Sequence, residues 1–149
     1  MKYLARDRWT RYWAFLAAVF LVLAWDEAAA VHESLISPVR EALALSGIFY
    51  FAWIIPAFIV VVLFGCVYLR FIAALPPQTR SRFIIAAVVI LSGALVLESI
   101  GGWHFERVGE TPDMTFELIS SLEEFLEMAA LIVFLNALLT HLISILPPH

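Results

Sequence analysis

Four stretches of this chain are long and apolar enough to cross a lipid bilayer as helices. A helix needs about 20 predominantly apolar residues to span the hydrocarbon layer, which is about 30 Å thick. The stretches cover approximately residues 9–30, 47–69, 83–101 and 118–146. Hydrophobic residues make up 63% of the 149, against about 45–50% in soluble domains. The sequence therefore predicts one integral membrane domain over 1–149, with an all-α fold and a four-helix transmembrane bundle.

The first stretch has an alternative interpretation as a cleaved signal peptide. Lys2, Arg6, Arg8 and Arg11 precede it, and Ala28-Ala29-Ala30 offers an A-x-A cleavage site. Three spans would remain after such cleavage.

The basic residues predict which side of the membrane each end faces. Four of them precede the first span, and Arg70, Arg80 and Arg82 flank the link between the second and third spans. The opposite side carries Arg40 and Arg107. Because Lys and Arg in short loops favour the cytoplasmic side, this split predicts two cytoplasmic termini and a bacterial inner (plasma) membrane location. Twelve of the thirteen acidic residues then fall on the outer side.

The first outer loop is predicted to hold a short interfacial amphipathic helix. Ser37 before Pro38 is typical of a helix start, with proline at the first helical position. Apolar residues repeat at four-residue spacing and leave the charged ones elsewhere on the helix, as in helices that lie on a membrane surface. The repeating residues are Val31, Leu35, Val39 and Leu43.

Other local signals refine the predicted spans. Pro56 falls inside the second span, where it predicts a kink or a freed backbone carbonyl, or is a proline that a membrane helix tolerates. Thr79 follows Pro76-Pro77 and is a candidate cap for the third helix. Residues 102–115 are predicted as the second outer loop. Asn136 in the fourth span is expected to hydrogen-bond across helices.

Carboxylates gather where three predicted helices reach the outer side. The first and third spans end there and the fourth begins there, so their acidic residues and two histidines are expected at one level. Glu123, Glu124 and Glu127 share one face of the fourth helix. Arg40 and Arg107 are too few to pair with so many acids, so a dry cluster requires protons or a bound cation. The candidate residues are Asp26, His32, Glu98, His104, Glu123, Glu124 and Glu127.

This ligand set predicts a divalent metal site. Carboxylates combined with imidazole suit Zn, Mn or Fe. No Glu-x-x-His motif occurs, which weakens a di-iron carboxylate interpretation. The structural alternative places the same acids in the headgroup layer with their carboxylates in water.

Three functions remain open. The leading one is binding of a cation near the outer face; the others are a small proton- or ion-coupled transporter and a non-catalytic accessory or assembly subunit of a membrane complex. The sequence does not decide whether the chain is an enzyme. The expected partners are the lipid bilayer and a homo-oligomer or larger membrane complex. Nucleic acid is excluded, because the nine basic residues are dispersed. Cys66 is the only cysteine, which excludes an intrachain disulfide and a CxxC site.

The arrangement of acids also carries a resemblance. Asp-Glu-x4-His-Glu follows the first span, Glu98 lies near the end of the third, and Glu-Glu-x-x-Glu begins the fourth. This pattern resembles small bacterial four-helix integral membrane proteins of unassigned function. The resemblance implies a membrane location and supplies no activity.

Overall fold

The computed structural model describes residues 9–146, and the regular elements in this range are helical. The labels η1 and η2 denote short 3₁₀ helices, and η3 denotes a π-helix. In chain order the elements are α1 (Thr10–Ala29), η1 (Glu33–Leu35), α2 (Ile36–Leu43), η2 (Gly47–Phe49), α3 (Ile54–Ala74), α4 (Pro77–Leu91), η3 (Ser92–Leu97), α5 (Glu98–Arg107) and α6 (Met114–Ile145).

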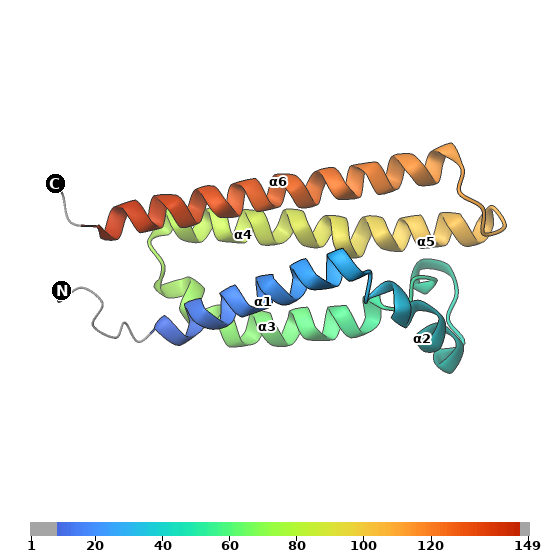
Figure 1. The fold of residues 1–149 in the computed structure, drawn as a ribbon, viewed down its shortest axis with the longest axis horizontal. Coiled ribbons are helices and arrows are strands. Elements are labelled where there is room, and N and C mark those ends of the chain that lie inside the picture. The colour runs from blue at the N-terminus through green and yellow to red at the C-terminus, as the bar shows by residue number, and fades with distance from the viewer. Residues whose placement is uncertain (1–8, 147–149) are drawn as a thin grey trace.

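Four helical rods in this range are long and apolar enough to cross a membrane. They are α1, α3, the continuous run α4–η3–α5 and α6. The rods lie side by side, and α1 begins at the same end at which α6 finishes (Figure 1). We call this end the terminal end and the opposite end, which carries α2, the loop end. The predicted all-α class is confirmed over the described residues, and four helices there are long and apolar enough to span a membrane, as predicted.

The four rods have two different lengths. With 20 and 21 residues, α1 and α3 are about 30 Å long, which matches the hydrocarbon layer. The run from Pro77 to Arg107 has 31 residues and α6 has 32, or about 47 Å each. The additional length projects beyond α1 at the loop end (Figure 1). There α5 packs against α6 and η2, so the loop end forms a cap above the shorter rods.

The second span begins later than the sequence predicts. It was expected from residue 47, but α3 starts at Ile54 and continues to Ala74. Residues 47–49 form η2, because the backbone N–H of Gly47 donates a hydrogen bond to Oε2 of Glu106 (2.6 Å) in α5. This contact holds the segment against the cap and separates it from the span.

The third helix is longer than predicted. Residues 102–115 were expected to form a loop, but α5 continues to Arg107 and the connection is only 108–113. Gly101 and Gly102 are buried, and their missing side chains leave space for Ile119 and Phe51 respectively. Close packing therefore stabilises helical glycines that the sequence alone would assign to a turn.

Pro56 is tolerated in the second span, whereas the two predicted helix starts, at Thr79 and at Ser37-Pro38, were wrong. Pro56 lies in the first turn of α3, where its missing N–H has no intrahelical partner, so it causes no loss of a helical hydrogen bond. Helix α4 begins with Pro77, and Thr79 is buried within this helix instead of capping its N-terminus. In the first loop, α2 begins at Ile36 because η1 leads directly into it, and Pro38 falls within its first turn.

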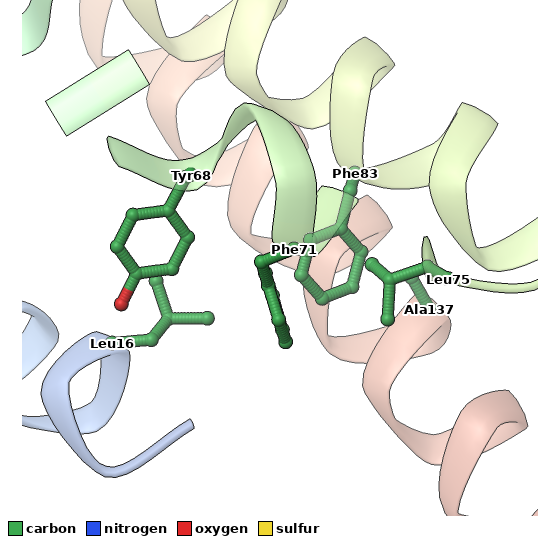
Figure 2. Close-up of a cluster of buried hydrophobic side chains, with 6 residues drawn as sticks. All are labelled: Leu16, Tyr68, Phe71, Leu75, Phe83 and Ala137. Atoms are coloured by element: carbon green, nitrogen blue, oxygen red, sulfur yellow. The ribbon is translucent and has the colours of Figure 1, made fainter. Parts of the chain in front are cut away.

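A buried apolar cluster joins the four rods in their terminal half. Phe71 and Tyr68 of α3 are the largest fully buried side chains. The hydroxyl of Tyr68 donates a hydrogen bond to the carbonyl oxygen of Tyr12 in α1 (2.8 Å). In lipid, such packing and interhelical hydrogen bonds hold helices together. Figure 2 shows the cluster: Leu16, Tyr68, Phe71, Leu75, Phe83 and Ala137.

Small side chains bring α4 and α6 into close contact. Ala86, Ala130 and Ala137 are almost completely buried, and small residues let helix backbones approach closely. Nearer the terminal end, Arg82 donates a hydrogen bond to Oδ1 of Asn136 (2.8 Å). The predicted hydrogen bond of Asn136 across helices is confirmed.

A pair of glycine variants tests the cap packing. A Cβ at Gly102 would lie 2.9 Å from Cδ2 and 3.2 Å from the backbone N of Phe51, whereas a Cβ at Gly65 would meet nothing within 4 Å. We expect Gly102→Ala to lower the free energy of unfolding by about 1–3 kcal/mol. Gly65→Ala should leave it unchanged or raise it by up to about 1 kcal/mol. Thermal unfolding in detergent measures both, and equal stability of the two variants would contradict the packing.

Candidate cation site

Three carboxyl groups meet where α5 begins beside α6. Glu98 is the first residue of α5, and Glu123 and Glu127 lie one turn apart on α6. The carboxyl groups of Glu98 and Glu123 are within hydrogen-bonding reach, and Glu127 interacts electrostatically with both. All three side chains are half-buried. We call Glu98, Glu123 and Glu127 the carboxyl cluster.

The helix that carries Glu98 is irregular immediately before it. The π-helix η3 ends at Leu97, and π segments often occur at functional sites because they change which side chains face a neighbour. Within η3, a Cβ at Gly93 would lie 3.2 Å from the carbonyl oxygen of Glu123 and 3.4 Å from Cγ of Glu127. Gly93 therefore lets α6 approach closely enough for the carboxyl cluster to form.

Trp53 bounds the carboxyl cluster on the side of α3. Its indole Nε1–H donates a hydrogen bond to Oε1 of Glu98 (3.0 Å). The same indole packs against the ring of His32, with 4.7 Å between centroids. Trp53 therefore touches both the cluster and the first loop.

His32 is held by Asp26 at the end of α1. Its Nδ1 lies 2.8 Å from Oδ2 of Asp26, and its backbone N–H donates to Oδ1 of the same carboxylate (2.9 Å). The chain turns back at Ala30, which has the left-handed φ of 49° and closes the helix on the carbonyl of Asp26. Both carboxylate oxygens of Asp26 are therefore in contact with His32.

His104 forms a second, separate pair. Its Nε2 lies 2.8 Å from Oδ1 of Asp113, which is the N-cap of α6 and accepts a hydrogen bond from the backbone N–H of Phe116 (2.8 Å). The Phe116 N–H, and after it His104, lower the pKa of the Asp113 carboxyl below its usual value. This pair stabilises the start of α6.

The structure thus brings together part of the predicted site. Glu98, Glu123 and Glu127 converge, and Glu127 also interacts electrostatically with His32. Among the contacts described in residues 9–146, Asp26 is linked to the cluster through His32 and Trp53. The other two predicted residues lie elsewhere. Glu124 is exposed on α6, although it interacts electrostatically with Glu123 and Glu127. His104 belongs to the pair with Asp113.

Residues outside the predicted set complete the surroundings. Trp53, Gly93 and Asp113 were not among the predicted site residues. Glu27, exposed at the end of α1, interacts electrostatically with Glu127.

Neither a basic partner nor a metal group accompanies the cluster among residues 9–146. The ion pairs described in this range are His32–Asp26 and His104–Asp113. No group of three or more His, Cys, Asp or Glu side chains in the range is placed so that it could hold a metal ion. The negative charge of the cluster is therefore not balanced by a described lysine or arginine.

The cluster lies about one bilayer thickness from the terminal end. Glu127 precedes the last residue of α6, Ile145, by 18 positions, or about 27 Å of helix. Glu98 follows the first residue of α4, Pro77, by 21 positions, or about 32 Å. With a hydrocarbon layer about 30 Å thick, the cluster falls at the boundary between the membrane-length rods and the cap.

Comparison with protein families adds one finding. A family described as "Domain of unknown function (DUF8692)" matches residues 1–142. The chain belongs to this family. The matched range includes the whole carboxyl cluster and both His–Asp pairs. Neither the curated proteins nor the solved structures contain a match to the chain. The family carries no assigned activity, so the proposal of function depends on the geometry of the site.

Acid should loosen the start of α6 through Asp113. Because the folded-state pKa of Asp113 is lowered, its contribution to stability is present above the unfolded pKa of about 3.9 and is lost as the pH falls through the folded pKa. Hydrogen exchange of the Phe116 amide, corrected for intrinsic exchange, should therefore accelerate in acid. Asp113→Asn keeps a cap but cannot titrate, so its corrected exchange should not change over this range. The same acid-induced acceleration in Asp113→Asn would contradict this assignment.

Proposed function

We propose that this chain is an integral membrane protein that binds an exchangeable cation at the carboxyl cluster, and that the cation is a proton shared by Glu98 and Glu123. The observation that carries the proposal is the hydrogen-bonding reach between these two carboxyl groups. Two ionised carboxylates have no donor between them and repel each other. A proton between them supplies the donor and removes one negative charge.

Other ways of balancing the charge are less well supported. A basic partner is absent from the described ion pairs of residues 9–146. A divalent metal such as Zn, Mn or Fe takes three or four protein ligands, and the described arrangement offers no such group. The divalent metal that the sequence predicts is therefore the alternative occupant of the carboxyl cluster, which an experiment must distinguish from a proton.

The membrane arrangement is part of the same proposal. We propose that the four rods form a transmembrane bundle in a bacterial inner membrane, with the loop end outside and α2 at the outer interface. The terminal end carries Arg11, Arg70, Arg80 and Arg82, whereas the carboxyl cluster lies toward the loop end. The predicted basic residues Lys2, Arg6 and Arg8 lie outside the described residues. Labelling of a cysteine at position 110, in a Cys66→Ala background, from the outside alone supports this orientation, and labelling from the cytoplasm alone contradicts it.

The site favours proton coupling over a purely structural role. A proton-binding group at the membrane boundary exchanges with water on one side, which is the first requirement of a small proton-coupled transporter. An accessory subunit has no need of carboxyl groups held together at this cost. Association with lipid, with further copies or with a larger complex is compatible with either role and remains a prediction.

Infrared spectroscopy tests the bound cation directly. In lipid nanodiscs, the spectrum should contain the carbonyl stretch of a protonated carboxyl group. Glu98→Gln and Glu123→Gln should each remove it, because each leaves the other carboxylate without a partner. Glu117→Gln is the matched control, since Glu117 is exposed in the first turn of α6, and it should leave the band unchanged.

The same samples distinguish the metal. Stoichiometric Zn, Mn or Fe by elemental analysis, lost in Glu98→Gln and accompanied by no protonated band, would replace the proton with a metal. Absence of both the band and the metal in the wild-type protein would refute cation binding at this cluster.

A further inference from the structure

We propose that His32 delivers protons to Glu98 and that Trp53 is the positioning residue that keeps the two apart. This inference rests on the proposed function, because it names the group that loads the same carboxyl cluster. The structure supplies a chain of contacts that runs from the end of α1 to α6, and one member of this chain cannot carry a proton.

The contacts are continuous across four segments. The carboxylate oxygen Oδ2 of Asp26 in α1 lies 2.8 Å from Nδ1 of His32. The ring of His32 packs against the indole of Trp53, the residue before α3, at 4.7 Å. Trp53 donates to Oε1 of Glu98 in α5 at 3.0 Å. Glu98 lies within hydrogen-bonding reach of Glu123 in α6.

Asp26 determines which nitrogen of His32 exchanges protons. A carboxylate that accepts from Nδ1–H keeps that proton on Nδ1 and leaves Nε2 as the position where a proton binds and leaves. The side chain of His32 is 22% exposed, so water reaches it more easily than a fully buried group. The Nε2 atom of His32 can therefore accept a proton from solvent at the loop end.

The transfer balances in atoms and charge. The Nε2–H bond of the imidazolium breaks and an O–H bond forms at Oε1 of Glu98. The electron pair of the broken bond stays on Nε2, which leaves a neutral imidazole with its Nδ1–H still on Asp26. Glu98 becomes a carboxylic acid that can donate to Glu123. A further proton from water returns His32 to the imidazolium.

Trp53 blocks this transfer in the described arrangement. An indole N–H is a donor only and does not relay protons. Its ring covers His32, and its N–H occupies Oε1 of Glu98, the oxygen that would accept the proton. Rotation of the indole frees both groups at once. Trp53 follows the turn at residues 50–53 rather than lying inside a helix, so fewer backbone contacts oppose its movement.

The surrounding charges attract protons to the path. His32 faces Asp26 from α1 and Glu127 from α6. Glu98 faces Glu123 and Glu127 from α6, and Glu27 adds a further acid near Glu127. The described groups around the path are therefore acidic, and they attract a proton at short range.

The molecule contains its own control. The pair of His104 and Asp113 has the same 2.8 Å separation and similar histidine exposure, at 20%. No contact of His104 with Trp53 or the carboxyl cluster is described in residues 9–146. A change at His104 therefore removes a histidine of the same kind without touching the proposed path.

A pH-jump experiment with infrared detection tests the inference. In nanodiscs, the rate at which the protonated carboxyl band appears after a drop in pH should fall at least about 10-fold in His32→Gln. Asp26→Asn should also slow it, while His104→Gln should not change it. Trp53→Phe keeps an aromatic ring but removes the N–H on Glu98, so it should accelerate the appearance of the band. Circular dichroism and the equilibrium amplitude of the band identify any variant that fails to fold.

The outcomes separate this inference from the proposed function. If the wild-type protein shows no protonated band, the proposed function fails. If the band is present but His32→Gln and His104→Gln load at equal rates, or Trp53→Phe loads no faster than the wild type, the inference fails while the proposed function stands.

Discussion

The close approach of α6 to the run α4–η3–α5 is the constraint on which the candidate site depends. Gly93 has no side chain where a Cβ would press on the backbone of Glu123 and on Glu127, and buried Ala86 and Ala130 keep the same helices close. Without this approach, Glu98 and Glu123 would not share one space. In the proposed membrane arrangement, where hydrophobic burial does not drive helix association, packing of small residues and interhelical hydrogen bonds would supply it.

The unequal rods give the site its position. Because α1 and α3 are as long as the bilayer is thick, whereas their neighbours are about 15 Å longer, a cap of α5, η2 and the first turns of α6 stands above them. The carboxyl cluster lies at the floor of this cap. A carboxyl group at this depth is less costly than one at the bilayer centre, yet it is still shielded from free solvent. In the proposed function, such a position would combine proton retention with exchange.

The sequence predicted the elements that follow from apolar length, and it missed those that follow from packing. The span of α1 was predicted to within one residue at each end, since a long apolar run carries that information alone, whereas α6 begins at Met114, four residues before the predicted start. Gly102 was assigned to a loop because its burial in a helix depends on Phe51, about fifty residues earlier. Convergence of Glu98, Glu123 and Glu127 could be predicted from helix direction and spacing. The separate use of His104 could not, because it depends on Asp113 in a loop whose path the tertiary contacts determine.

The convergence of Glu98 and Glu123 is most directly tested by solid-state NMR of the protein in lipid, with ¹³C at the two side-chain carboxyl carbons. The account predicts a dipolar cross-peak between these two carbons, with at least one of them showing the chemical shift of a protonated acid. Two isolated carboxylate resonances with no cross-peak would show that the groups point apart into solvent, and the site would not exist.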